Sequence, residues 1–202
     1  MTETILLHER LKNCRLLLAS QSPRRRELLT GCGLPYTLTA KYPCDECYPA
    51  RLPAEEVPGY LSLLKSRAYP EPLAEGDILL TADTVVIVAE RVLGKPHSRD
   101  EAVGMLQSLS GRSHTVITGV TLRDAACTHT FSVPTRVWFR MLSETEIGHY
   151  VDTYQPFDKA GSYGVQEWIG YVGIERIDGS FYNVMGLPVQ KLYTELEKFL
   201  DK

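Results

Sequence analysis

The chain has 202 residues, 44% of them hydrophobic and 23% charged, which excludes a disordered, collagen-like or coiled-coil protein. Its 22 basic and 25 acidic side chains give a net charge of −3, without the basic excess that would hold it on nucleic acid or an anionic membrane. No apolar run approaches the roughly 20 residues needed to cross a bilayer, and charged residues interrupt the N-terminal stretch 1–13. We therefore expect neither a membrane span nor a secretory signal peptide.

An odd number of cysteines in a chain long enough to form a core without disulfides favours a reduced, cytoplasmic setting: Cys14, Cys32, Cys44, Cys47 and Cys127. Only Cys44-Asp-Glu-Cys47 has a spacing typical of zinc or redox chemistry. No second pair completes a zinc site, and the surrounding prolines disfavour the helix expected after a redox motif. We interpret this pair as accidental, ahead of a metal or redox site.

In the first half of the chain, a short apolar run over Arg15–Ala19 predicts a strand buried on both faces. A helix should follow, with Ser22 as N-cap and Pro23 at its first position. Apolar residues at helical spacing over 60–68 predict another helix, and Asp77–Val88 predicts a second buried strand region.

In the second half, the predicted elements are a helix capped by Ser98 and ending at Ser110-Gly111, strands over Thr115–Leu122 and Thr128–Leu142, a helix capped by Ser143, a strand over Tyr171–Ile177, and an amphipathic helix beginning at Pro188. Neighbouring strands flanked by helices indicate an α/β fold with a mixed sheet. No repeat or low-complexity tract divides the chain, so we expect one domain over residues 14–202, preceded by a peripheral N-terminal extension, 1–13.

Three arginines, Arg24-Arg-Arg26, occupy the first turn of a predicted helix, where the helix dipole disfavours positive charge. An anion there would offset this cost. Free backbone N–H groups, the hydroxyls of Ser20 and Ser22 and the guanidinium groups together suit a phosphate group. A solvated basic helix face is the alternative, and the turn is not a P-loop, because Gly-x-x-x-x-Gly-Lys is absent.

Asp83 lies in an apolar strand region, where a carboxylate needs a partner, a metal or a role as a base, although a turn-forming Asp is the alternative. Asp45 and Glu46 offer further oxygen ligands, and Lys65 and Lys95 offer cations. Lys65, near a predicted helix end, also fits an ordinary surface lysine, whereas Lys95 lies in a predicted loop.

A Gly-rich segment, Asp158-Lys-Ala-Gly-Ser-Tyr-Gly-Val-Gln166, would let the backbone approach a ligand closely, and Gln166 could pair with a nucleobase edge. An ordinary surface loop is the alternative. Carboxylates together with several cations are what a polyphosphate transition state requires. The residues alone thus favour a Mg²⁺-dependent enzyme acting on a phosphorylated metabolite, without defining which one.

Ordered motifs from about Arg15 to the C-terminus resemble those of Maf-family nucleotide pyrophosphatases: Leu18-Ala-Ser-Gln-Ser-Pro-Arg-Arg25, Ala82-Asp-Thr-Val-Val86, Gly94-Lys-Pro96, Leu109-Ser-Gly with His114, Thr118-Gly-Val120, the segment 158–166, and Asn183-Val-Met-Gly-Leu-Pro188. The resemblance implies hydrolysis of a nucleoside triphosphate to its monophosphate and pyrophosphate. It also implies a cleft between two lobes of an α/β fold shared with inosine triphosphate pyrophosphatases (the Maf/Ham1 fold).

By resemblance, Asp83 is the proton acceptor and a ligand of Mg²⁺ or Mn²⁺, and Glu46 is the second acid of the cleft and a further metal ligand. Lys65 and Lys95 are its catalytic lysines, which neutralise triphosphate charge. Ser20, Ser22 and Arg25 match the phosphate-binding turn.

Arg24, Thr84 and Gln166 resemble the branch that hydrolyses dTTP and UTP, whereas a branch acting on 7-methyl-GTP has Trp, Gln and Glu at these places. We therefore expect pyrimidine triphosphates, including modified ones, as substrates. The rivals are a non-enzymatic regulator of cell division and septum formation, and a nucleic-acid binder that uses the arginine turn. A homodimer is implied at the level of the family only.

Overall fold

The computed structural model describes residues 6–201 and contains one seven-stranded mixed sheet in the order β2-β1-β3-β5-β6-β7, with β4 paired to β3. The strands are β1 (Arg15–Leu18), β2 (Thr37–Leu38), β3 (Asp77–Val88), β4 (Arg91–Leu93), β5 (Ser113–Arg123), β6 (Thr128–Phe139) and β7 (Ile174–Asp178). β1 runs parallel to β2 and β3, and all other pairs are antiparallel. The predicted mixed α/β sheet is confirmed.

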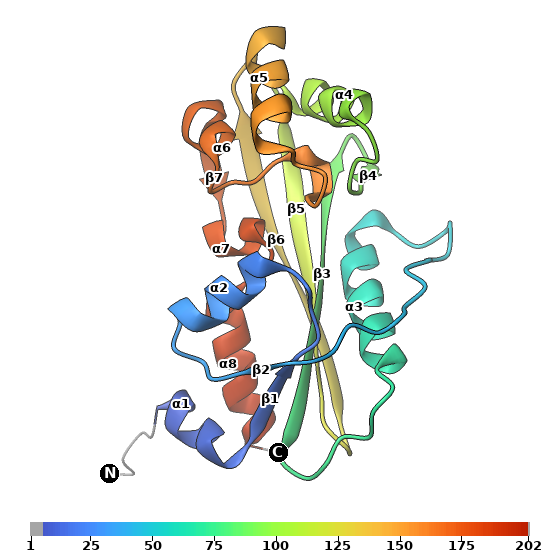
Figure 1. The fold of residues 1–202 in the computed structure, drawn as a ribbon, viewed down its shortest axis with the longest axis vertical. Helices are drawn as coiled ribbons and strands as arrows, with labels where there is room; N and C mark the ends of the chain where they lie inside the picture. The colour runs from blue at the N-terminus through green and yellow to red at the C-terminus, as the bar shows by residue number, and fades with distance from the viewer. Residues whose placement is uncertain (1–5, 202) are drawn as a thin grey trace.

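The helices are α1 (Leu7–Arg10), α2 (Pro23–Gly31), α3 (Val57–Ala68), α4 (Arg99–Leu109), α5 (Glu144–Tyr154), α6 (Trp168–Gly173), α7 (Phe181–Met185) and α8 (Val189–Leu200), with 3₁₀ turns at Leu11–Asn13, Ala54–Glu56 and Ala160–Ser162. α3 lies on one side of the long strands and α2, α7 and α8 on the other (Figure 1). α4, α5 and α6 gather at the far end of these strands. The molecule thus has two lobes that share β3, β5 and β6.

Local sequence signals account for most of the helix starts. Ser143 and Glu146 form a complete capping box at α5. At α4 the Ser98 hydroxyl accepts from the backbone N–H of Glu101, but the Glu101 carboxylate accepts from His97 instead of closing the box. α8 buries one apolar face in the main core: Val189, Leu192, Leu196 and Phe199.

The prediction of a strand over Tyr171–Ile177 is wrong for the first half of that segment. Residues 168–173 form α6, and pairing with β6 begins only at Ile174. Tyr171 and Val172 are exposed, so their apolar character reflects no buried strand. β2, β4 and α7 were not predicted, because elements of two to five residues are too short to show a hydrophobic period.

The described part of the N-terminal stretch packs on the domain, contrary to the expected peripheral position. Leu7 and Leu11, which lie one helical turn apart, are buried in the main core, and the backbone N–H of Leu7 donates to the Tyr193 hydroxyl of α8 at 3.2 Å. Residues 1–5 lie outside the described residues, and the boundary at residue 14 stays a prediction.

The edge of β3 is left without a neighbouring strand between β1 and β4. β1 pairs with β3 only as far as Leu80, and β4 begins its pairing at Val86. Asp83 and Thr84 lie in this gap and, as neighbours in a strand, point to opposite faces of the sheet. Groups from both faces can therefore meet at one opening, just beyond the carboxyl end of the parallel strand β1.

Candidate active site

One cavity of about 460 Å³ lies at the gap in the β3 edge. All ten residues predicted for the site line it: Ser20, Ser22, Arg24, Arg25, Glu46, Lys65, Asp83, Thr84, Lys95 and Gln166. They come from the turn before α2, the first turn of α2, the segment before α3, α3 itself, β3, the loop after β4 and the segment before α6. The structure therefore brings the whole predicted set together, although their roles stay predictions.

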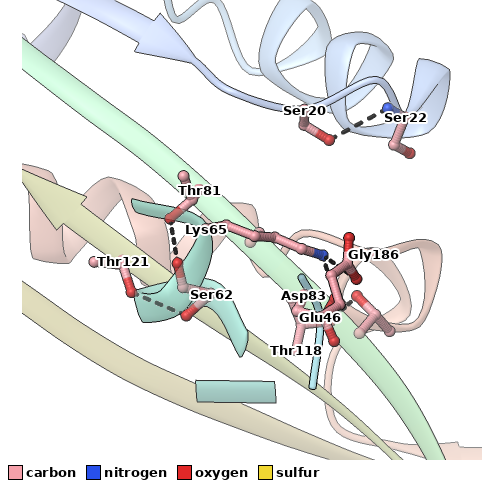
Figure 2. A network of polar contacts seen from close by, with 12 residues as sticks. Ser20, Ser22, Glu46, Ser62, Lys65, Thr81, Asp83, Thr118, Thr121 and Gly186 are labelled. Carbon is pink, nitrogen blue, oxygen red and sulfur yellow. Dashed lines mark hydrogen bonds and ion pairs between the residues drawn. The ribbon is translucent and has the colours of Figure 1, made fainter. Parts of the chain in front are cut away.

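Lys65 joins two carboxylates at the centre of this cavity. Its Nζ lies 2.6 Å from Oδ1 of Asp83 and 2.9 Å from Oε2 of Glu46 (Figure 2). Asp83 is 13% exposed and belongs to β3, so it is not the turn-forming Asp of the alternative interpretation. The two carboxylates converge on one cation, which explains how a largely buried acid is tolerated in an apolar strand.

α3, which carries Lys65, is fixed closely against the sheet. The backbone of Pro58 and Gly59 approaches β5 so tightly that a Cβ at Gly119 would lie 2.2–2.3 Å from it. The backbone carbonyl of Ser62 accepts a hydrogen bond from the Thr81 hydroxyl, and the Ser62 hydroxyl is hydrogen-bonded to the Thr121 hydroxyl (Figure 2). The Lys65 carbonyl accepts from the Tyr42 hydroxyl, whose pKa burial raises to about 12. Tyr42 also lines the cavity and was missed in the sequence.

Most of the N–H groups of the Arg25 guanidinium are hydrogen-bonded to other groups of the protein. Its guanidinium donates to the carbonyls of Gly186 and Ala82 and to the hydroxyls of Ser20 and Thr84, which uses four of its five N–H groups. Burial lowers its pKa, against the opposing effect of Asp83. Gly186 has φ 121°, a conformation that favours glycine, and it turns its carbonyl to Arg25 at the end of α7.

Arg24 reaches across the cavity to the other lobe. Its Nη1 lies 2.7 Å from Oδ2 of Asp158, and its Nε donates to the Met185 carbonyl at 3.3 Å. The clustered arginines of α2 are thus partly explained by protein partners: Arg24 and Arg25 join α2 to the β3 edge, α7 and the opposite lobe. Ser22 is the N-cap as predicted, but its side chain makes no capping hydrogen bond, so its hydroxyl stays available.

Gln166 lines the cavity, and one of its side-chain polar atoms is unsatisfied. Its Oε1 is buried and has no hydrogen-bond partner among the described residues. A buried amide oxygen without a partner is costly, and a donor on a bound ligand would remove the cost. Lys95, by contrast, is exposed at the cavity wall.

The Cys44 and Cys47 thiols show no sign of activation. Burial raises the pKa of Cys44, and a hydrogen bond to Asp45 raises that of Cys47. Both thiols therefore stay protonated at neutral pH and are weak nucleophiles and metal ligands. Within residues 6–201 no group of three or more His, Cys, Asp or Glu side chains could hold a metal ion.

A buried aromatic cluster backs the cavity. Tyr163, which lines it, hydrogen-bonds through its hydroxyl to Nε2 of His114 at 2.7 Å, and both rings pack on Phe139. Burial lowers the pKa of His114 to about 3, so its ring is neutral at physiological pH. Both residues lie in the motifs of the resemblance, but nothing in the sequence indicated that they touch.

These features place the chain in a known class of protein. The family described as Maf-like protein matches residues 15–199, and the chain belongs to this family.

Among its relatives, a dTTP/UTP pyrophosphatase of Bacteroides thetaiotaomicron is 54% identical over 91% of this chain and 95% of that protein. A dTTP/UTP pyrophosphatase of Porphyromonas gingivalis is 50% identical over 95% and 97%. A solved HAM1 protein from Coxiella burnetii is 14% identical, covers 92% of this chain and 99% of its own, and has a TM-score of 0.47, too low to support a conclusion. Within the described residues, no helix has the length and apolar character of a membrane span.

Proposed function

We propose that this protein hydrolyses dTTP and UTP to the nucleoside monophosphate and pyrophosphate. The observation that carries the proposal is the Asp83–Lys65–Glu46 group at the centre of a cavity that also holds Arg24 and Gln166. The names of relatives at about 50% identity agree with it. The cavity offers cations for the triphosphate, a carboxylate that can accept the proton of the attacking water and an amide for the nucleobase.

The carboxylates fit a divalent cation, because both already direct an oxygen at one shared cation, the Lys65 ammonium. Asp83 and Glu46 would hold Mg²⁺ or Mn²⁺, since Mg²⁺ in phosphate chemistry is usually bound through one or two carboxylates. When bound, the metal supplies charge neutralisation on the triphosphate.

Asp83 acts as the proton acceptor of the reaction. A water oxygen forms a bond to the α-phosphorus, the bond from that phosphorus to the bridging oxygen of the β-phosphate breaks, and pyrophosphate leaves with the electron pair. The proton of the attacking water passes to the Asp83 carboxylate. Lys65 and Lys95 offset the negative charge on the triphosphate, and the Ser22 hydroxyl is free to donate to a phosphate oxygen.

Gln166 selects the base. The imide N3–H of uracil and thymine is a donor that suits the unpartnered Oε1, whereas cytosine carries an acceptor at N3. A site that leaves a buried polar atom unpaired with the wrong base discriminates strongly against it.

The test is a panel of hydrolysis reactions with Mg²⁺ that separates pyrophosphate from orthophosphate, over dTTP, UTP, 5-methyl-UTP, CTP, GTP, ITP and 7-methyl-GTP. We expect pyrophosphate release led by dTTP and UTP. Preference for 7-methyl-GTP or ITP would retain the chemistry and refute the selection by Arg24, Thr84 and Gln166. No turnover with any divalent metal would contradict the enzyme assignment.

A further inference from the structure

The Thr84 hydroxyl belongs to a chain of hydrogen bonds that leads away from the cavity. Nη2 of Arg25 donates to Oγ1 of Thr84 at 3.2 Å. Oγ1 of Thr84 lies 2.9 Å from Oγ1 of Thr118 on β5. The Thr118 hydroxyl in turn donates to the backbone carbonyl of Asn183 on α7 at 3.1 Å.

The directions in this chain follow from which atoms carry hydrogens. A carbonyl oxygen can only accept, so the 3.1 Å bond between Thr118 and Asn183 forms only when the single hydroxyl hydrogen of Thr118 points at Asn183. Thr118 is then the acceptor in its bond with Thr84, and the hydroxyl hydrogen of Thr84 points at Thr118. A guanidinium can only donate, so Arg25 occupies one lone pair of Thr84. Towards the cavity, Thr84 has a lone pair left and no hydrogen.

The end of this chain of hydrogen bonds that lies away from the cavity is buried, so water cannot compete for its donors and acceptors. Thr118 and Asn183 are both fully buried. Asn183 is held by its side-chain amide, which donates to the Val133 carbonyl at 2.8 Å and to the Thr135 hydroxyl at 3.0 Å. Rotation of the Thr118 hydroxyl towards Thr84 would break its bond to the buried Asn183 carbonyl, which would then keep only the Gly186 backbone N–H as a donor among the described residues.

We propose that Thr118 is a positioning residue that fixes the polarity of the Thr84 hydroxyl, so that Thr84 accepts and never donates a hydrogen bond in the cavity. This inference rests on the proposed function and specifies how its site selects substrate. The substrate group that Thr84 contacts is then a donor. UTP and dTTP share two candidate donors, the 3′-hydroxyl of the sugar and the imide N3–H of the base, and Thr84 would share the second of these with Gln166 as a three-centre hydrogen bond.

The test compares discrimination ratios in Thr118→Val, which removes the hydroxyl with little change of volume and leaves the Thr84 hydrogen free to turn into the cavity. The base arm is the ratio of kcat/KM for UTP to that for CTP. The sugar arm is the ratio for UTP to 3′-O-methyl-UTP, which keeps an acceptor oxygen and lacks the donor. We expect one ratio to fall roughly tenfold, because Thr84 can then donate to the acceptor that it repels in the native protein. The ratio that falls identifies the donor.

Three further variants separate polarity from packing. Thr118→Ser keeps the hydroxyl and should restore the native ratios. Thr121→Val makes the same exchange at another fully buried threonine of β5, one that bonds to Thr130 and to Ser62 of α3 but not to the Thr84 chain, so both ratios should stay native even if turnover and stability fall. In Thr84→Val the further change Thr118→Val should have no additional effect on either ratio, because the two residues act as one unit. If Thr118→Val fails to fold, Thr118→Ala replaces it.

Binding of the product monophosphates gives a readout that does not need turnover. If the base is the donor, the ratio of the Kd of CMP to that of UMP, measured by calorimetry, should fall in Thr118→Val. If the sugar is the donor, the ratio of the Kd of 3′-O-methyl-UMP to that of UMP should fall instead. Native ratios in Thr118→Val, or an equal fall in Thr121→Val, would overturn the inference. A native protein that binds UMP over CMP without releasing pyrophosphate would refute the proposed function and leave the Thr118 ratios decisive.

Discussion

Arg24 on α2 and Asp158 in the segment after α5 form an ion pair of 2.7 Å across the cavity, between the two lobes. Asp158 is held in turn by Lys159, whose Nζ lies 2.7 Å from its other oxygen and 3.0 Å from Oε1 of Glu167. Glu167 directly follows Gln166. A chain of ion pairs therefore leads from Arg24 to Glu167, the neighbour of Gln166, and so links two of the residues that we assign to substrate selection.

The first prediction concerns this connection. Asp158→Asn should raise KM for UTP several-fold and change kcat little, because Arg24 loses the contact that orients it before substrate binds. Steady-state kinetics with UTP give both parameters. Asp152→Asn, which breaks the exposed Arg99–Asp152 pair of the same lobe, is the matched control and should leave KM native. An unchanged KM in Asp158→Asn would mean that the ion pair does not position Arg24.

The second prediction tests the proposed proton acceptor. Asp83→Asn should lower kcat with dTTP at least about a hundredfold while the protein stays folded, because the amide neither takes a proton nor binds a hard metal well. Asp77→Asn, at the start of the same strand, removes a carboxylate that pairs with Arg15 and should affect stability alone. Retention of more than about a tenth of native turnover by Asp83→Asn would refute the role of this carboxylate.

The third prediction concerns the base. Gln166→Leu should still release pyrophosphate but lose most of its preference for UTP over CTP, because the buried acceptor for the imide N–H is gone. Competition between the two nucleotides in one reaction measures this preference directly. Gln190→Leu, on the exposed side of α8, serves as the control. A native UTP preference in Gln166→Leu would place base selection elsewhere in the cavity.

The fourth prediction is a pH dependence of stability that arises from His114. Its pKa is about 3 in the folded protein and about 6.5 when exposed, so the unfolded chain binds more protons between these values. Its contribution is complete above pH 6.5 and is lost as the pH falls, by up to about 1.4 kcal/mol per pH unit.

Urea unfolding between pH 7 and pH 4.5 should show this slope in the native protein and in His97→Gln, whose ring is exposed. In His114→Phe the slope should be much smaller, whatever the absolute stability of the variant. An equal slope in His114→Phe would assign the pH dependence to other groups.

The fifth prediction concerns the metal. Treatment with EDTA should abolish hydrolysis, and Mg²⁺ or Mn²⁺ should restore it. Glu46→Gln should raise the metal concentration needed for half-maximal activity at least several-fold, since one of two carboxylate ligands is lost. Glu55→Gln, on the 3₁₀ turn that precedes α3, should behave as the native protein does. Full activity in EDTA would exclude a metal requirement.

Much of the fold could be predicted because long helices and strands show a clear hydrophobic period and recognisable capping residues. The capping residues Ser98 and Ser143 and the apolar run of β3 were identified correctly. The site residues could be assembled only through the resemblance, because Glu46, Asp83 and Gln166 are far apart in sequence. Their partners could not be foreseen: the contact of Arg24 with Asp158 spans 134 positions, and local patterns carry no information about it. The same holds for the bond between Thr84 and Thr118, which depends on the register of β3 against β5.

The strands that pass through both lobes also set how the enzyme can move. β3, β5 and β6 run for 12, 11 and 12 residues without a connecting linker between the lobes. Enzymes that close by rotation about a flexible hinge need a few backbone positions that absorb large dihedral changes. Here the hydrogen-bonded ladder of three strands resists such changes, so an approach of the lobes would have to twist the sheet. Nucleotide would accordingly enter a preformed cleft. We expect product release to depend on breaking ion pairs across the cavity rather than on a large domain rotation.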